Sequence, residues 1–291
     1  MEEGADRTVG LRDGRRLGYA QWGDPRGQPL LYFHGWPGSR VEGRLGADAA
    51  RATGVRLIAL DRPGMGLSDF QARRTFVDWA DDVAEVAAAL RLDRFAVLGI
   101  SGGGPYAAAC AWKLSDRLTG AGIVSSLAPF DVAGAVAGMG RRNRLTFQLV
   151  GRLAILRRAL FALMAVSVRR RPGRVLERGV PKPVDKEYID RPNVRGILEE
   201  SLSEAFRAGS RGPAWEMGLY VRPWGFRVED IRTPVYLSHG EEDANAPINM
   251  GRYLAARIPD CRANFVPGEG HLHFIDRLPA IFAELSRRSP G

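Results

Sequence analysis

The sequence contains few of the residues that hold small secreted or metal-binding proteins together. Of its 291 residues, two are cysteines, Cys110 and Cys261, and four are histidines. Two cysteines exclude a disulfide framework and a cysteine-based zinc cluster, and four histidines leave few ligands for a metal site. We therefore expect an apolar core to stabilise the chain, and a chain of this length with 45% hydrophobic residues can form one.

Long hydrophobic segments are also missing. The first ten residues are polar and charged, so they do not have the pattern of a secretory signal. The longest strongly apolar stretch, residues 149–168, carries three arginines, and its charge-free part, residues 159–168, is too short to span a bilayer. These features predict a soluble protein of the cytoplasm.

Acidic residues are scarce in one stretch in the middle of the chain. The net charge is +9, but residues 132–232 alone hold 20 basic and 10 acidic residues, which leaves the rest nearly neutral. Residues 139–174 contain ten arginines and no acid. Because helical patterns dominate here, we interpret residues 131–232 as a helical insertion with a solvated, arginine-rich face. Weak contact with a membrane surface or with an acidic substrate is the alternative interpretation. Nucleic-acid binding is not expected, because no binding motif accompanies the charge.

The rest of the chain alternates between short apolar runs and helical patterns. The runs typical of buried strands are residues 30–33, 56–60, 95–98, 121–124, 234–237 and 263–266. Helical patterns follow at residues 75–90, 102–113, 248–257 and 275–287, the first with Thr75 as its N-cap. Such an alternation predicts a parallel sheet with helices on both faces. The turn signal Asp13-Gly14 predicts an antiparallel hairpin at the start of this sheet.

The third apolar run ends in a motif typical of a nucleophilic serine. Residues 99–103 have the sequence Gly-Ile-Ser-Gly-Gly, which matches the G-x-S-x-G nucleophile elbow. The motif requires a sharp turn from a strand into a helix, and it lies here between a predicted strand and a predicted helix. Glycines two residues before and after the serine avoid clashes in such a turn. Ser101 is therefore the candidate nucleophile.

A nucleophilic serine needs a general base, and the base needs an acid that orients it. Both should follow later strands of the sheet, because the carboxyl ends of parallel strands meet at one edge. Asp243 follows the strand at residues 234–237 and His271 follows the last strand, so we predict a triad of Ser101, Asp243 and His271. Two further histidines, His34 and His239, are expected to be structural. The alternatives for the acid and the base are Glu241, Glu242, Asp131 and His273.

The serine reaction also requires two N–H groups that bind the oxyanion. Gly102, directly after the nucleophile and at a helix N-terminus, is expected to supply one of them. The other is expected from the glycine-containing loop after the strand at residues 30–33, where the Trp36 N–H is the best candidate. The residues predicted to contact the substrate are the Trp36 ring and three aromatic residues of the insertion, Phe147, Trp215 and Trp224.

Together these segments resemble the α/β-hydrolase superfamily. The matching pieces are residues 34–38, 61–69, 99–103, 239–243 and 270–271, which occur in this order along the chain. The resemblance implies an α/β-hydrolase fold, with a mostly parallel eight-stranded sheet, helices on both faces and a helical cap inserted after the sixth strand. It divides the chain into a core domain, residues 1–130 and 233–291, and a cap domain, residues 131–232. In the family, the loop at residues 61–69 would be a structural and pocket-lining element.

The resemblance and the triad predict a serine hydrolase that cleaves a carboxylic ester, a lactone or a thioester through an acyl-enzyme. The expected substrate is a small hydrophobic or amphipathic ester, and no metal or cofactor is expected. Ser101 separates the chain from haloalkane dehalogenases and epoxide hydrolases, which resemble it but carry aspartate at that position. Gly102 separates it from the similar prolyl aminopeptidases, which carry tryptophan there.

Two other interpretations stay open. The same triad is able to cleave a C–C or amide bond, and an aminopeptidase would need carboxylates in the insertion to hold the substrate ammonium. Candidates for that role are Glu200, Glu204 and Glu216. A ligand receptor without turnover is the other interpretation, because the fold alone does not define the function. The sequence does not indicate an oligomeric state.

Overall fold

The computed structural model describes residues 3–132, 137–139, 144–180 and 182–287. Its centre is an eight-stranded sheet with the strand order β1-β2-β4-β3-β5-β6-β7-β8. The strands are β1 (Arg7–Gly10), β2 (Arg16–Gly23), β3 (Gln28–Phe33), β4 (Val55–Leu60), β5 (Phe95–Ile100), β6 (Leu118–Val124), β7 (Val235–Gly240) and β8 (Cys261–Val266). Only the pairings β1–β2 and β2–β4 are antiparallel, and the remaining pairs are parallel. The prediction of a mostly parallel sheet with an antiparallel start is confirmed.

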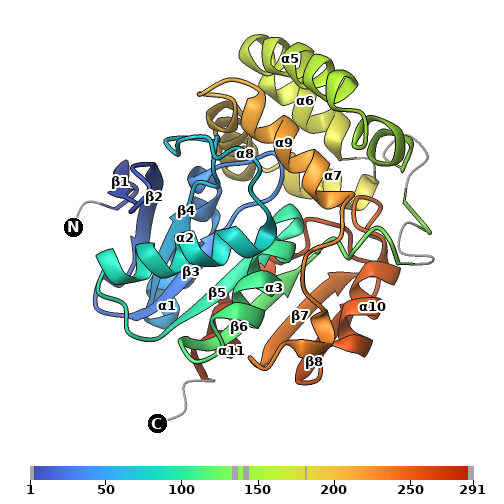
Figure 1. Ribbon diagram of the computed structural model, residues 1–291. Coiled ribbons are helices and arrows are strands. Elements are labelled where there is room, and N and C mark those ends of the chain that lie inside the picture. The colour runs from blue at the N-terminus through green and yellow to red at the C-terminus, as the bar shows by residue number, and fades with distance from the viewer. Residues whose placement is uncertain (1–2, 133–136, 140–143, 181, 288–291) are drawn as a thin grey trace.

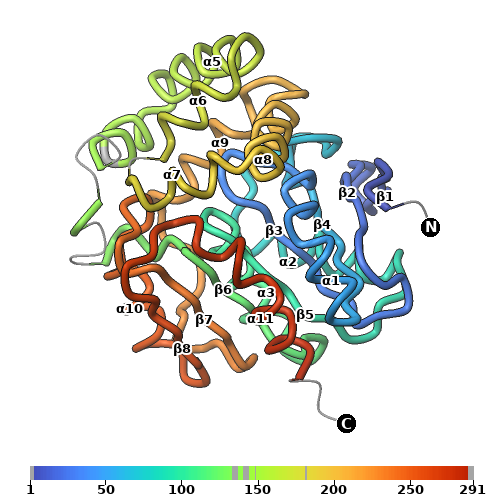
Figure 2. The backbone as a smooth tube through the Cα atoms, turned by 180° about the vertical axis from the view of Figure 1, so that it is seen from behind, coloured from blue at the N-terminus to red at the C-terminus, as the bar shows by residue number. Residues whose placement is uncertain are grey.

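Helices cover both faces of the sheet, as predicted (Figures 1 and 2). One face carries α1 (Ala47–Thr53) and α11 (Phe274–Arg287), and the other carries α2 (Phe76–Ala89), α3 (Gly104–Lys113) and α10 (Ile248–Arg257). Successive side chains of a strand point to opposite faces, so the alternating residues of β3 enter two separate apolar clusters. Leu31 and Phe33 pack with α2 and α3, whereas Leu30 and Tyr32 pack with α1 and α11. The sheet is therefore buried from both sides, which explains why its strands are almost continuously apolar.

The first long helix begins where its sequence predicts. Thr75 accepts a hydrogen bond from the Asp78 N–H, and the Asp78 carboxylate accepts one from the Thr75 N–H, which together form a capping box. Such a cap satisfies backbone donors that have no partner inside the helix.

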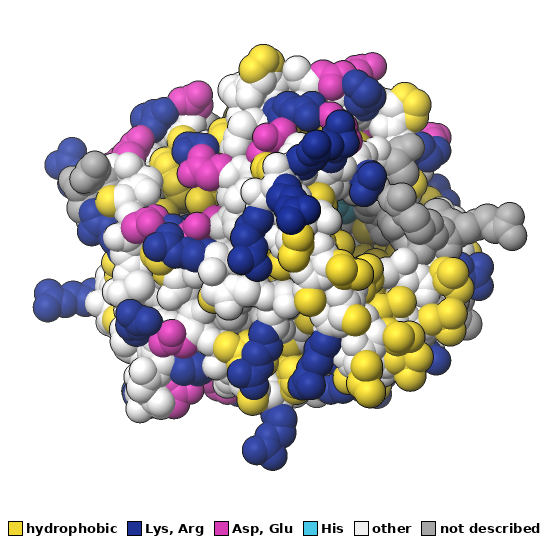
Figure 3. All heavy atoms as spheres, turned by 90° about the horizontal axis from the view of Figure 1, so that it is seen from above, with side chains coloured by type: hydrophobic (Ala, Val, Ile, Leu, Met, Phe, Trp, Pro, Cys, Tyr) yellow, Lys and Arg dark blue, Asp and Glu magenta, His cyan; other side chains and the backbone are white. Residues whose placement is uncertain are grey.

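The chain between β6 and β7 forms a group of helices above the carboxyl edge of the sheet (Figure 1). After a short π-helix at Thr146–Val150 come α5 (Ala154–Arg170), α6 (Pro172–Gly179), α7 (Pro183–Ile189), α8 (Pro192–Ala205) and α9 (Arg211–Tyr220). Seen from this side, many Lys and Arg side chains lie on the surface (Figure 3). Part of the segment, residues 133–136, 140–143 and 181, lies outside the described residues. No helix in the described part of the chain is both long and apolar enough to cross a membrane.

Candidate active site

The serine motif forms a strained turn between β5 and α3. Ser101 has a φ of 54°, in the left-handed region that a serine rarely adopts. A Cβ atom on Gly99 would lie 2.3 Å from the carbonyl oxygen of Gly103, and one on Gly103 would lie 2.2 Å from that of Phe33. Only glycine fits at these two positions, which explains the spacing of the motif. The turn lifts the Ser101 hydroxyl to the edge of the sheet, where it lines a cavity.

The three residues predicted as a triad form one chain of hydrogen bonds. His271, in the loop between β8 and α11, places Nε2 2.9 Å from Ser101 Oγ and Nδ1 2.7 Å from Asp243 Oδ2. Asp243 follows β7, and its Oδ1 accepts hydrogen bonds from the N–H groups of Asn245 and Ala246. These bonds fix the carboxylate in its own turn, so its other oxygen faces the imidazole.

The alternative acids point elsewhere. Glu241 and Glu242 are exposed, and each forms a surface ion pair, with Arg252 and Lys182 respectively. Asp131 is exposed as well. Of the four candidate acids, Asp243 is the one that contacts His271.

The other three histidines are buried, and each bonds to the surrounding structure. His34 Nδ1 lies 2.7 Å from the Gly35 carbonyl oxygen, and His239 Nε2 lies 2.7 Å from the carbonyl oxygen of Ala246, in the turn that carries Asp243. His273 Nε2 lies 2.9 Å from Ser238 Oγ, and burial lowers the pKa of this histidine to about 4. Burial also lowers the pKa of His34 and His239. All three are thus neutral near pH 7 and support the loops around the site.

His271 has a different electrostatic environment. Burial by itself would lower its pKa, but the charge and the hydrogen bond of Asp243, together with the charges of other nearby carboxylates, outweigh burial, and the pKa of His271 lies above its usual value. The same pairing holds the pKa of Asp243 below its usual value, although burial opposes this. The pair therefore stabilises an imidazolium next to Ser101, which is what a general base needs after it has accepted a proton.

The two residues expected to supply the oxyanion donors lie side by side. A Cβ atom on Gly102 would approach Trp36 Cβ to 2.6 Å and the Tyr220 hydroxyl to 2.4 Å, so the backbone at Gly102 is closely packed. The Tyr220 hydroxyl, from α9, donates to the Gly102 carbonyl at 3.0 Å. Gly102 and Trp36 both line the same cavity as Ser101.

The peptide unit that carries the Trp36 N–H is fixed through its carbonyl group. This carbonyl belongs to Gly35, and it lies 2.7 Å from His34 Nδ1 and 3.1 Å from Arg62 Nη2, which donates to it. Arg62 also donates to the His34 carbonyl. Because a peptide unit is planar, fixing its C=O direction also fixes the direction of its N–H.

Arg62 belongs to a buried ionic network that sequence reasoning did not find. Its guanidinium is fully buried and forms two hydrogen bonds with the Glu216 carboxylate of α9, at 2.7 and 3.0 Å. Glu216 also accepts from Arg74 and from the hydroxyl of Tyr106, a residue of α3. Burial opposes its ionisation, but the two arginines outweigh burial and lower the pKa of Glu216 to about 2. The network connects the loop after β3, which contains Trp36, to α3 and α9.

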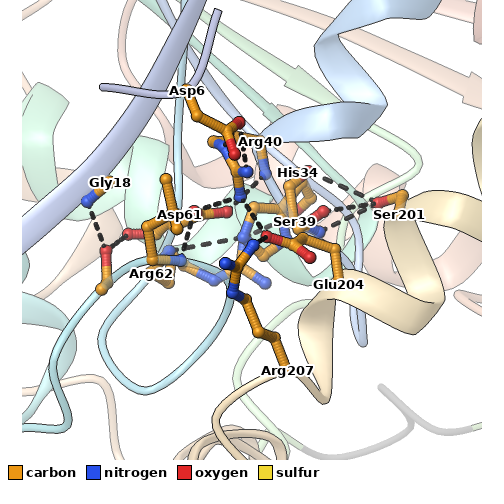
Figure 4. Close-up of polar contacts among 12 residues, drawn as sticks. Asp6, Gly18, His34, Ser39, Arg40, Asp61, Arg62, Ser201, Glu204 and Arg207 are labelled. Carbon is orange, nitrogen blue, oxygen red and sulfur yellow. Dashed lines mark hydrogen bonds and ion pairs between the residues drawn. The ribbon is translucent and has the colours of Figure 1, made fainter. Parts of the chain in front are cut away.

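A second polar network joins the loop at residues 61–69 to α8 (Figure 4). The buried Arg40 donates to Asp61 Oδ2 at 2.9 Å and to Glu204 Oε1 at 2.8 Å. Ser201, also from α8, accepts a hydrogen bond from the Ser39 N–H at 3.0 Å. The loop thus has a structural role in this chain. None of its residues is among the described residues that line the cavity next to Ser101, so the pocket-lining role that the resemblance implies does not agree with its position.

The cavity next to Ser101 has a volume of about 560 Å³ and mostly apolar walls. Trp36 and Phe147 line it, as predicted, together with side chains of α5, α6 and α8. Trp215 and Trp224 are not among the described lining residues. Trp224 is 3% exposed and packs against Phe76, and Trp215 packs edge-on against Phe70. The prediction that these two tryptophans contact the substrate therefore does not agree with their positions.

Two carboxylates close to the site were missed. Glu42 lines the cavity, and its Oε1 accepts from the Gly35 N–H at 2.7 Å and from the Tyr32 hydroxyl at 2.8 Å. Asp185, on α7, accepts from the Leu272 N–H at 2.7 Å, directly after His271. Both contribute to raising the pKa of His271. Asp185 gives no sequence signal, because its partner lies 87 residues further along the chain.

The sequence and the fold agree on the class of protein. The family model of the alpha/beta hydrolase fold matches residues 28–278, so the chain belongs to this family. Among the described residues, no group of three or more histidine, cysteine or acidic side chains is arranged to hold a metal ion.

Two of the sequence relatives carry haloperoxidase names, and one similar solved structure carries the name of an esterase. Over 124 residues the chain is 36% identical to a non-heme chloroperoxidase of Streptomyces lividans, a match that covers 42% of this chain and 45% of that protein. It is 25% identical over 275 residues to a non-heme haloperoxidase of Rhodococcus erythropolis, covering 90% and 92% of the two chains. Among solved structures, a thermophilic esterase from Thermogutta terrifontis superimposes with a TM-score of 0.72 at 23% identity, over 98% of this chain and all of that one. The last similarity concerns the fold.

Proposed function

We propose that this protein is a serine hydrolase that cleaves a carboxylic ester, a lactone or a thioester through an acyl-enzyme. The observation that carries the proposal is the chain of hydrogen bonds from Ser101 through His271 to Asp243, at 2.9 and 2.7 Å. Its position on the elbow after β5, next to an apolar cavity, supports the same conclusion.

The reaction follows from these positions. Ser101 Oγ attacks the substrate carbonyl carbon while His271 Nε2 accepts the hydroxyl proton, and Asp243 stabilises the resulting imidazolium. The N–H groups of Gly102 and Trp36 bind the oxyanion. His271 then gives its proton to the leaving alkoxide, which departs as an alcohol and leaves an ester on Ser101. A water molecule, deprotonated by His271, releases the acid and regenerates the serine.

The helical segment 131–232 is proposed to act as a cap, and the substrate is proposed to enter beneath it. Leu160, Phe161 and Met164 of α5 form part of the cavity wall, which suits an apolar acyl or alcohol group. The three glutamates considered for an ammonium-binding role pair instead with arginines. The pairs are Glu216 with Arg62, Glu204 with Arg40 and Glu200 with Arg44. These pairings favour a neutral ester over an aminopeptidase substrate.

The test is a turnover assay over p-nitrophenyl esters of increasing chain length, beside a lactone, a thioester, a β-diketone and an amino-acid p-nitroanilide. We expect ester turnover with an optimum of chain length that reflects the 560 Å³ cavity. The anilide tests whether Glu42, which does line the cavity, binds an ammonium. Turnover of the anilide or of a β-diketone, with none of any ester, would replace the proposal by an amide or C–C hydrolase. Tight ligand binding without repeated turnover would indicate a receptor.

The pH dependence of kcat/KM provides a first prediction. His271 must be neutral to accept the serine proton, and its pKa lies above the usual value of 6.5. Activity should therefore fall as the pH decreases through the raised pKa, with a midpoint of the acidic limb above 6.5. The measurement is kcat/KM for one ester from pH 5 to 9, with buffers of constant ionic strength. A midpoint below 6.5 would contradict the electrostatics described for this pair.

Asp185 provides a second prediction. Asp185→Asn keeps an oxygen for the Leu272 N–H but removes the charge that raises the pKa of His271, so the acidic limb should move to lower pH. Asp185→Ala also removes the hydrogen bond, and kcat should fall by roughly tenfold because the His271 loop loses an anchor. Asp190→Asn, on the exposed C-terminal end of the same helix, is the control and should change neither value. An unmoved limb in Asp185→Asn would show that its charge does not act on His271.

A further inference from the structure

One helix face of the insertion is unusual for a surface. Every large hydrophobic side chain that is strongly exposed among the described residues lies between residues 145 and 166. On α5, Ile155 is 81% exposed and Leu163 is 69% exposed. Scattered apolar residues are common on protein surfaces, but a contiguous exposed set marks an interaction site.

Helical spacing places two of these residues, Ile155 and Val166, on one side of α5 together with the exposed alanines between them. Ile155, Ala159, Ala162 and Val166 follow one another at intervals of three or four residues, and all are exposed. The opposite side is buried against the protein through Phe161, Ala165 and Val168. A helix that is apolar on both sides is usually enclosed by protein or lipid, whereas α5 is enclosed on one side only.

Arginines border this apolar face. Arg158 and Arg169 each lie three residues after an exposed apolar residue of the face, and Arg152 lies just before the helix. All three are exposed, and none forms an ion pair with a carboxylate of the described residues. In the view from above, hydrophobic and basic side chains gather together at the lower right, whereas the acidic side chains in view lie mainly to the left and the top (Figure 3).

We propose that the outer face of α5 docks on the surface of an anionic phospholipid bilayer. An apolar stripe with flanking arginines suits a helix that lies in the plane of the interface, with the stripe among the acyl chains and the arginines at the phosphates. A second copy of the chain fits less well, because a two-fold contact through this face would bring the arginines of both copies together.

Docking through the outer face of α5 would place the cavity at the membrane. Leu163 belongs both to the exposed set and to the lining of the cavity, so the cavity reaches the outer surface at α5. A substrate dissolved in the bilayer would then enter without crossing water. Docking itself does not rest on the proposed function, because vesicle binding is measured without turnover.

The test is co-sedimentation of the full chain with vesicles of phosphatidylcholine alone and of phosphatidylcholine mixed with phosphatidylglycerol, at low and high salt. We expect binding to the mixed vesicles that weakens with salt. Ile155→Ser/Val166→Ser, two positions that do not line the cavity, should lower the affinity by roughly tenfold or more. Arg158→Gln/Arg169→Gln should remove the preference for phosphatidylglycerol. Thermal unfolding and turnover of a soluble ester verify that the variants are folded.

The matched control is Arg26→Gln/Arg232→Gln. These exposed arginines precede β3 and β7, at the opposite edge of the sheet, so their loss should leave vesicle binding unchanged. An equal loss of vesicle binding in this control would show that net charge alone causes the binding, and it would overturn the assignment of the α5 face. No binding to either vesicle, or equal binding to both, would also overturn the proposal. A wild-type dimer that the Ile155→Ser/Val166→Ser variant converts to a monomer would assign the face to a second copy instead.

Discussion

Ser101→Ala is expected to lower kcat for ester hydrolysis by roughly 10⁴- to 10⁶-fold, the largest change in activity that a single substitution should cause here. Alanine removes the atom that forms the acyl-enzyme and leaves the rest of the site in place. A residual rate above that in water should persist, because the two oxyanion donors and the cavity still bind the substrate. The measurement is kcat and KM for the best p-nitrophenyl ester, together with labelling by a fluorophosphonate, which should be lost.

Ser203→Ala is the matched control, since Ser203 is exposed on α8 and its hydroxyl donates to the Glu199 carbonyl of its own helix. It should retain wild-type turnover and should not alter labelling. If purified Ser101→Ala hydrolysed esters at the wild-type rate, Ser101 would not be the nucleophile, although the assignment of the fold would stand.

The second large effect concerns stability. Glu216→Leu leaves the fully buried Arg62 and the nearly buried Arg74 without their carboxylate. Buried charge without a partner is costly, so the free energy of unfolding should fall by about 3–5 kcal/mol. Glu216→Gln keeps an acceptor for the Tyr106 hydroxyl and should lose less. Denaturant unfolding of both variants measures the difference. The slope m of the free energy of unfolding against denaturant concentration should stay the same in both variants if unfolding remains two-state.

An exposed ion pair supplies the comparison. Glu200 pairs with Arg44 at the surface, and Glu200→Gln should change the free energy of unfolding by at most about 1 kcal/mol. Glu216→Gln should also lower kcat, because Arg62 holds the Gly35 carbonyl and thus the direction of the Trp36 N–H. Equal stability of Glu216→Leu and Glu200→Gln would mean that the two arginines find other partners or water.

The sequence was most informative where a residue type and a local turn together define a feature. The serine turn is an example, because a Cβ at Gly99 or Gly103 would clash with nearby backbone atoms, so the motif is visible as spaced glycines. The capping box at Thr75 and the hairpin at Asp13-Gly14 are also local. The apolar strands follow from burial of the sheet on both faces, which leaves a continuous pattern in each strand.

Features that depend on contacts across the chain could not be predicted in this way. Glu216 appeared in the sequence as an available carboxylate, and its pairing with Arg62 joins residues 154 positions apart. Trp215 and Trp224 are aromatic residues, a type that often lines pockets. Whether such a ring faces a cavity or the core depends on the rotation of its helix or loop. No periodicity in a short segment determines that rotation when apolar residues occur on several sides.

The polar contacts of α7, α8 and α9 have a consequence for how a ligand enters and leaves. Asp185, Glu204 and Glu216 each fasten one of these helices to the core through bonds to buried groups. The segment 131–232 therefore cannot tilt away as one rigid piece without breaking all three attachments. Helices α5 and α6 pack on each other and on α8, and α5 also packs on α9, so among the described helices of the segment these two are held less directly to the sheet. Amide hydrogens of α5 should accordingly exchange with solvent faster than those of α9, which would make α5 the gate of the cavity.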